Sequence, residues 1–153
     1  MEFDFQSNDM TEPCFLADAM LGKLTRYLRI LGYSAEYTQE EDSKIVQRFK
    51  KSRCIILTRD KFLCQRLPRN CVYVNSIDVK NQLIELKLKT GIRYELPITP
   101  KRCSLCNAPL RRIGVMGDRE VWVCTKCGQP YWRGSHIRRI ENVIREINMM
   151  FGE

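Results

Sequence analysis

Four cysteines constrain this 153-residue chain more than any other feature. Cys103 and Cys106 form one C-x2-C pair, and Cys124 and Cys127 form a second pair after seventeen intervening residues. Two residues between ligands allow both sulfurs of a pair to bind one tetrahedral zinc ion, and the intervening stretch suits a short β-hairpin. The spacing therefore predicts a zinc ribbon over residues 102–134, with these four cysteines as the ligands of a structural Zn²⁺.

The charge of the chain is strongly positive and unevenly distributed. It has 26 Lys and Arg against 18 Asp and Glu, for a formal net charge of +8. Residues 1–12 hold four acids and no base, which predicts an acidic, flexible N-terminus, whereas residues 101–139 hold nine bases and two acids. Such a basic body favours a polyanionic partner, either a nucleic acid or an acidic membrane. A solvated basic surface with no partner is the alternative.

Membrane insertion and secretion are not indicated by the sequence. No segment reaches the roughly 18 apolar residues of a membrane span, and the N-terminus MEFDFQSNDM has no basic region followed by an apolar one. The remaining cysteines, Cys14, Cys54, Cys64 and Cys71, are scattered, and we expect them to be reduced and buried as small hydrophobic residues. This pattern predicts a reducing compartment, cytoplasmic or nuclear, and no membrane partner.

Strand and helix patterns alternate over residues 13–90. Short apolar runs predict four strands, at Cys14–Ala17, Ser34–Tyr37, Cys54–Thr58 and Cys71–Val74. Helical periodicity or a capping aspartate predicts four helices, at Ala19–Leu31, at Asp42–Lys51, from Asp60, and at Asp78–Lys89. Alternating units of this length predict an α/β domain with a parallel sheet flanked by helices.

The two segments that flank the ribbon have different patterns. Residues 91–101 contain Pro97 and Pro100 and no clear periodicity, so we expect a linker. Residues 135–153 have an apolar residue every third or fourth position, which predicts a C-terminal amphipathic helix. We expect its apolar stripe to dock on the protein's own body, with docking on a partner as the alternative. Glu141 and Arg145 are spaced to form an ion pair on this helix.

Three aspartates follow predicted strands or begin the next helix: Asp18, Asp42 and Asp60. The carboxyl ends of parallel strands meet at one edge of a sheet, so these side chains are expected to converge. Clustered carboxylates are ligands that Mg²⁺ or Mn²⁺ prefers, and such an ion activates water for attack on a phosphodiester. Helix capping alone is the alternative for each of them, and it is the stronger interpretation for Asp78.

Three sequence stretches, DAMLGKLTRYLRILGY, IILTRDKFL and CGQPYWRGSH, occur in that order between Phe15 and His136. They resemble the Mut-seven C-terminal RNase family, in which a PIN-like nuclease domain precedes a zinc ribbon. The resemblance implies a PIN-like α/β fold and metal-dependent cleavage of RNA, with Asp18, Asp42 and Asp60 as the catalytic acids. The family usually has a further acid where this chain has Phe62, and this departure removes a carboxylate from beside the implied metal ion.

Basic and aromatic residues are the candidates for RNA contact, because cations follow phosphates and aromatic rings stack on unpaired bases. The candidates are Lys23, Arg26, Arg111, Arg112, Tyr131, Trp132, Arg133, Arg138 and Arg139. A solvated helix face is the alternative for Lys23 and Arg26, and a place in the ribbon core is the alternative for Tyr131 and Trp132. Trp122 is expected to be structural, because it lies in the strand that leads to a zinc ligand.

Three functional hypotheses follow from these patterns. The first is an RNA-binding PIN-like protein that acts as a ribonuclease, with structural Zn²⁺ and catalytic Mg²⁺ or Mn²⁺. The second is a non-catalytic RNA-binding factor, for example one bound to ribosomal RNA on the ribosome. The third is a zinc-dependent adaptor for other proteins, which leaves the aspartates unexplained.

Overall fold

The computed structural model describes residues 13–38, 44, 47–48, 51, 53–67 and 69–153. These residues form two compact units. The α/β unit comprises residues up to 25 together with 33–92, and the ribbon unit comprises residues 26–32 together with 93–153. Asp42, residues 1–12 and most of the helix expected over Asp42–Lys51 lie outside the described residues. None of the described helices is long and apolar enough to cross a membrane.

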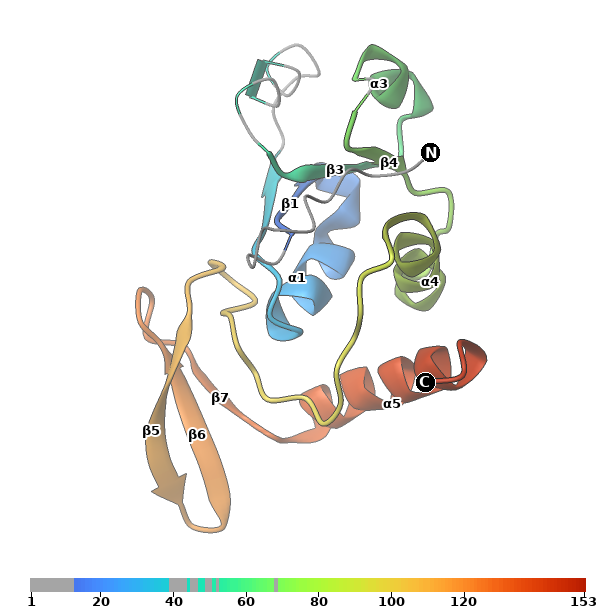
Figure 1. Cartoon of the computed structure of the whole chain (residues 1–153). Helices are drawn as coiled ribbons and strands as arrows, with labels where there is room; N and C mark the ends of the chain where they lie inside the picture. Colours follow the sequence, from blue (N-terminus) through green and yellow to red (C-terminus); the bar gives the residue numbers. More distant parts are fainter. Residues whose placement is uncertain (1–12, 39–43, 45–46, 49–50, 52, 68) are drawn as a thin grey trace. The chain divides into compact units, whose positions relative to one another are not determined.

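A four-stranded parallel sheet forms the centre of the α/β unit (Figure 1). Its strands lie in the order β2-β1-β3-β4, and all three pairings are parallel. The strands are β1 (Phe15–Asp18), β2 (Ala35–Thr38), β3 (Ile55–Thr58) and β4 (Cys71–Tyr73). The predicted α/β fold with a parallel sheet is therefore confirmed, because each predicted apolar run became a strand of this sheet.

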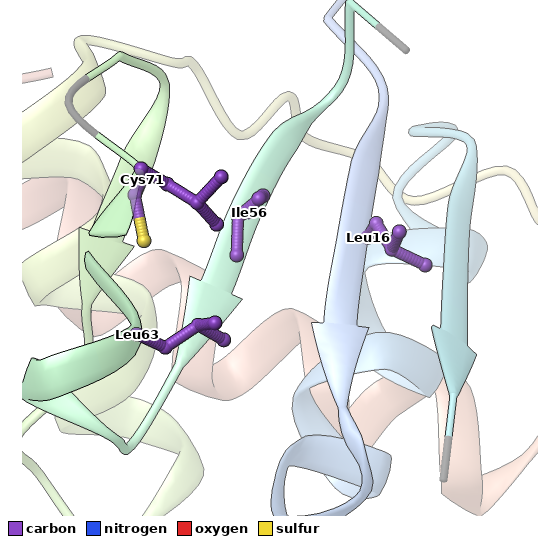
Figure 2. Packing of buried hydrophobic residues seen from close by; sticks show 5 residues of the cluster. Leu16, Ile56, Leu63 and Cys71 are labelled. Atoms are coloured by element: carbon purple, nitrogen blue, oxygen red, sulfur yellow. The ribbon is translucent and has the colours of Figure 1, made fainter. Parts of the chain in front are cut away.

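Helix α3 (Lys61–Arg66) covers one face of this sheet. Leu16, Ile56 and Cys71 are neighbours across three strands, and they pack with Leu63 and Leu67 of the α3 region (Figure 2). All five side chains are at most 7% exposed. Burying apolar area contributes about 25 cal/mol per Å², so this cluster is a main source of stability for the unit.

Three helical segments of the α/β unit begin directly after an aspartate that caps them. Asp18 precedes the 3₁₀ turn η1 (Ala19–Leu21), Asp60 precedes α3, and Asp78 precedes α4 (Val79–Thr90). Each side chain accepts a hydrogen bond from an amide in the first turn, as an N-cap residue does. The capping interpretation is thus confirmed for these three aspartates.

Helix α1 (Gly22–Ile30) and α4 differ in detail from the predicted apolar faces. Met20, expected on the apolar face, is 73% exposed because the chain forms η1 there before α1 begins. Leu88, at the end of the predicted inner face of α4, is 69% exposed. Gly32 follows α1 with a positive φ of 105°, which confirms the predicted stop, because glycine adopts this conformation without strain.

The expectation that four cysteines stay reduced is wrong in this structure. Cys14 forms a disulfide with Cys54, and Cys64 forms one with Cys71. The first pair precedes the adjacent strands β1 and β3, and the second joins α3 to β4, so tertiary pairing brings together residues that are scattered in the sequence. Cys71 is buried as expected. The prediction of a reducing compartment loses the support that free thiols gave it.

The ribbon unit contains a three-stranded antiparallel sheet, β5-β6-β7. Its strands are β5 (Leu110–Met116), β6 (Arg119–Cys124) and β7 (Pro130–Trp132). β5 and β6 form the hairpin that the cysteine spacing predicted (Figure 1). Trp122 is 6% exposed, as expected for a structural residue of the strand before a ligand.

Helix α5 (Ser135–Met150) packs on other segments of the ribbon unit. Its stripe of Ile137, Ile140, Ile144 and Ile147 is at most 2% exposed, which confirms docking on the protein's own body. Within the segment expected as a linker, Tyr94 and Ile98 are each 2% exposed, and α5 hydrogen-bonds to both of their backbones.

The predicted ion pair between Glu141 and Arg145 does not form. Glu141 is buried, accepts a hydrogen bond from the Ile98 amide and pairs with Arg133, while Arg145 donates to Asn142. A buried carboxylate needs a cation and a donor close by, and Arg133 and Ile98 supply both. The i, i+4 spacing shows that Arg145 is within reach of Glu141, but the buried position of Glu141 decides that Arg133 is its partner.

Candidate functional site

The four cysteines of the ribbon unit lie together. The Sγ atoms of Cys103, Cys106, Cys124 and Cys127 are all within 4.8 Å of one another. Cys103 and Cys127 are 3.6 Å apart at sulfur, and Cys106 and Cys124 are 3.3 Å apart. A tetrahedral zinc ion with Zn–S bonds of about 2.3 Å places its sulfurs roughly 3.8 Å apart, so the arrangement fits zinc closely.

The two cysteine pairs form turns with the same backbone pattern. The Asn107 amide donates to the carbonyl of Cys103 at 2.8 Å, and the Gly128 amide donates to that of Cys124 at 3.1 Å. Both donors have a positive φ, 71° at Asn107 and 79° at Gly128. Glycine and asparagine adopt this left-handed conformation most readily, so their positions just after the second cysteine of each pair allow the turn to close.

The thiol pKa values show how strongly these sulfurs interact. Burial raises the pKa of Cys124, but amide hydrogen bonds from Cys127 and Lys126 outweigh it and lower the pKa to about 6. The Gln129 amide lowers the pKa of Cys127, yet desolvation and the neighbouring thiols raise it to about 12. Four thiolates this close need a cation, and four sulfur donors match the preference of Zn²⁺.

Tyr131 supports the first cysteine pair from β7. Its hydroxyl oxygen lies 3.1 Å from Cys103 Sγ and accepts a hydrogen bond of 2.9 Å from the Ser104 amide. Burial and the contact with Cys103 raise its pKa to about 12, so the phenol keeps its proton for the sulfur. The ring is only 8% exposed, and we leave Tyr131 out of the proposed RNA contacts. Sequence reasoning missed this supporting role.

The carboxyl edge of the parallel sheet carries the described aspartates. Asp18 accepts hydrogen bonds from the Thr58 hydroxyl at 2.6 Å and from the Arg59 amide at 3.0 Å. The same Thr58 hydroxyl accepts one from the Asp60 amide at 2.9 Å. One buried hydroxyl therefore joins the Asp18 carboxylate at the end of β1 to the Asp60 backbone after β3, and the Asp60 carboxylate itself accepts from the Phe62 amide.

Polar groups after β4 extend this edge. Arg59 donates to the carbonyl of Ser76 at 2.6 Å, and Glu85 accepts from the amides of Asn75 and Ser76 and from Lys89. Partial burial raises the pKa of Glu85, but these hydrogen bonds outweigh it and leave the pKa below its ordinary value. Sequence reasoning missed Glu85, since it lies within α4 and well after the strand it serves.

The described carboxylates do not form a metal cluster. In the part of the chain that the structure describes, the four cysteines are the one group of three or more metal-ligating side chains close enough to share an ion. Asp18 and Asp60 also serve as helix caps, and Asp42 lies outside the described residues. Phe62, at the position where the resemblance implies an acid, is 62% exposed.

The remaining predicted contact residues are exposed cations and one exposed ring. Lys23, Arg26, Arg111, Arg112, Arg138 and Arg139 are exposed, and so is Trp132 at 41%. Arg112 pairs with Glu120 at 3.7 Å, and Arg133 pairs with Glu141. Arg29, on the same helix as Arg26, is 4% exposed and donates to the Ser104 carbonyl at 2.9 Å, so it supports the first cysteine pair.

Fold and site together define an α/β protein with a parallel sheet, carboxylates at one sheet edge and a four-cysteine ribbon. Comparison with protein families matches residues 13–144 to the Mut7-C RNAse domain. The match covers most of the chain, and the chain belongs to this family. The resemblance seen in the sequence motifs is thereby confirmed. Comparison with curated proteins finds no match, and comparison with solved structures finds none either.

Proposed function

We propose that this protein binds RNA through its ribbon unit. The family is that of an RNase domain, which makes RNA the natural polyanion for a chain of net charge +8. The observation that carries the proposal is a set of exposed cations in the ribbon unit that have no acidic partner among the described residues. These cations are Arg111, Arg119, Lys126, Arg138 and Arg139.

Cations without a partner are the ones that RNA phosphates neutralise most easily. Arg133 must leave Glu141 to bind a phosphate. Breaking this pair is unfavourable because the Glu141 carboxylate then stays buried without its cation. Arg111 has no such cost. Each phosphate that such a side chain neutralises releases counterions, so the binding affinity must fall steeply with salt concentration.

The test is RNA binding by the zinc-loaded full chain at several salt concentrations. Replacing Arg111 and Arg138 with alanine should weaken binding and lower the log–log salt slope by about 0.7 per lost contact on single strands and 0.9 on duplex. Arg145→Ala is the matched control, because that exposed arginine already donates to Asn142. Wild-type protein that ignores RNA at low salt, or variants with an unchanged slope, would remove these residues from the interface.

A second candidate function is metal-dependent cleavage of RNA at the carboxyl edge of the sheet. The observation that favours it is the Thr58 hydroxyl, which hydrogen-bonds both the Asp18 carboxylate and the Asp60 backbone amide. Together with Asp42 these aspartates would hold Mg²⁺ or Mn²⁺, which supplies an activated water for phosphodiester attack. Lys23 and Arg26 would then guide the RNA strand near Asp18.

Cleavage and simple binding make opposite predictions for the same variants. Asp18→Asn and Asp60→Asn should abolish Mg²⁺- or Mn²⁺-dependent cleavage and leave RNA affinity unchanged, since asparagine also caps helices. Absence of cleavage in the wild type would favour a non-catalytic cytoplasmic factor, with ribosomal RNA as its proposed target. Cross-linking in cells, followed by sequencing of the bound RNA, identifies that target directly.

A further inference from the structure

The ribbon unit contains a cavity that none of the roles above uses. It has a volume of about 270 Å³ and lies between the first cysteine turn, strand β7 and the first turn of α5. Ser104 and Leu105 line it from the cysteine turn, Pro130 and Trp132 from β7, and His136 and Ile137 from α5. Drug-sized ligands occupy cavities of about 300–1,000 Å³, so this one suits a smaller, flat group.

The walls of the cavity are largely apolar and open to solvent. Leu105 is 64% exposed and Trp132 is 41% exposed, although both are large apolar side chains. Ile137 is 2% exposed and connects the wall to the core of the unit. Apolar side chains beside a concave surface favour a ligand with an apolar face.

The Trp132 ring can lie where it does because residue 134 is a glycine and has no side chain. A Cβ atom at Gly134 would lie 2.7 Å from Trp132 Nε1, which is closer than such atoms approach. The φ of Gly134 is −100°, a value open to any residue, so close approach of the ring explains the glycine better than backbone strain does. Gly134 thus leaves space for the indole at the mouth of the cavity.

Polar groups accompany the apolar wall. Gly134 is the N-cap of α5 and supplies no side-chain hydrogen bond, and the first backbone bond of the helix is donated by Arg138. Ser135, His136 and Ile137, whose amides precede that bond, all line the cavity. The amides of these lining residues have no acceptor within the helix, so they are donors that a polar ligand near the aromatic wall can use.

We infer that this cavity receives one unpaired base of the bound RNA strand, stacked on Trp132. The inference rests on the proposed function, because the strand that delivers the base is held by the cations of the ribbon unit. Every base has a flat apolar face, and aromatic side chains bind such faces without regard to sequence. The excess of positive charge over residues 101–139 favours an anionic strand over an apolar peptide as the occupant.

Binding of the zinc-loaded full chain to a labelled ten-nucleotide RNA and to the same strand in a duplex tests this inference. Trp132→Ala should weaken single-strand binding about 5- to 150-fold, leave duplex binding within about twofold, and leave the salt slope unchanged. Trp132→Phe should recover most of the affinity, because it keeps a ring. Single-stranded RNA should also quench the fluorescence of Trp132, whereas Trp122 is buried.

Two further variants, Leu105→Ala and Gly134→Ala, and one control, Met149→Ala, keep the test decisive even if Trp132→Ala fails to bind zinc. Leu105→Ala removes part of an exposed wall and should weaken single-strand binding at least about threefold. Met149→Ala, at a residue that is 72% exposed and outside the cavity, should change nothing. Gly134→Ala should displace the indole and weaken single-strand binding while both tryptophans remain.

Each contrary outcome has its own meaning. Wild-type protein that binds no RNA overturns the proposed function itself. Salt-sensitive RNA binding that Leu105→Ala and Gly134→Ala leave unchanged overturns only the cavity inference. Free AMP or UMP that quenches Trp132 as tightly as the ten-nucleotide strand shows a mononucleotide site and overturns the assignment to RNA.

Discussion

The two units of this protein use their charged side chains differently. In the α/β unit, Asp18, Asp60 and Asp78 each cap a helix, and Glu85 binds two amides and a lysine. In the ribbon unit, cations such as Arg111 and Arg139 are exposed and have no acidic partner among the described residues. The acids of the first unit therefore support its fold, while the cations of the second remain available to a ligand.

This difference bears on where function resides. An aspartate that caps a helix would have to keep that role while binding a metal ion, so a metal site at the sheet edge would have to meet both requirements. The exposed arginines of the ribbon contribute little to the stability of a fold in water. Substitution of the acids in the α/β unit should therefore lower the free energy of unfolding, whereas substitution of the exposed arginines in the ribbon unit should weaken RNA binding. The following predictions test this difference.

The largest expected effect is loss of a zinc ligand. Cys124→Ser should release the metal and unfold the ribbon, because zinc contributes on the order of 10 kcal/mol to such modules. Trypsin should then cleave at Arg111 and Arg119, while the α/β unit stays resistant; mass spectrometry of the fragments measures both. A variant that keeps one zinc per chain and resists cleavage would contradict the four-cysteine site.

Loss of a disulfide should destabilise the α/β unit and leave the ribbon intact. The bond between Cys14 and Cys54 closes a loop of 40 residues, and the one between Cys64 and Cys71 closes a loop of seven. Chain entropy predicts costs of about 4 and about 2 kcal/mol, respectively, when each pair is replaced by serine.

Denaturant unfolding measures these two costs, and an unchanged zinc content serves as the control. If alkylation of the native, unreduced protein labels Cys14 or Cys54, this disulfide is absent and cannot contribute to the stability of the α/β unit.

Replacement of the Asp18 carboxylate should have an intermediate effect. Asp18→Ala removes acceptors for two amides and for the buried Thr58 hydroxyl, at an expected cost of about 2 kcal/mol in the free energy of unfolding. Asp78→Ala is the matched control, since it removes an exposed cap and should cost less. Equal effects of the two variants would show that the contact with Thr58 contributes nothing.

The smallest expected effect is that of Glu85, and it depends on pH. Its folded pKa lies below the ordinary value of 4.5, so the carboxylate stabilises the unit above about pH 4.5 and loses this contribution as pH falls further. Glu85→Gln should therefore cost about 1 kcal/mol at pH 7 and progressively less below pH 4.5. A cost independent of pH would assign the effect to packing.

Much of the fold could be predicted because its signals are local in sequence. The apolar run predicted at Cys54–Thr58 contains β3, Asp78 marked the start of α4, and the spacing of four cysteines indicated the ribbon. The strand and the helix start depend on a few consecutive residues, and the ribbon depends on two cysteine pairs whose internal spacing is recognisable without knowledge of the fold.

Features that depend on distant segments could not be predicted in this way. Arg29 has the sequence context of a surface cation on a helix, yet it is buried against Ser104, 75 residues further along the chain. Glu141 forms an ion pair with Arg133 and accepts a hydrogen bond from the Ile98 amide, whereas helical spacing suggested Arg145 as its partner. Cys14 and Cys54 meet because β1 and β3 are adjacent, and sheet order is a tertiary property.

The most direct measurement of the central claim is ultraviolet cross-linking of RNA to the zinc-loaded full chain, followed by mass spectrometry of the linked peptides. We expect cross-links within residues 102–139, with Trp132 among the linked residues and Arg111 nearby, and we expect them to disappear at high salt. Cross-links confined to residues 13–92, or cross-links that persist at high salt, would contradict the claim that the ribbon unit binds RNA.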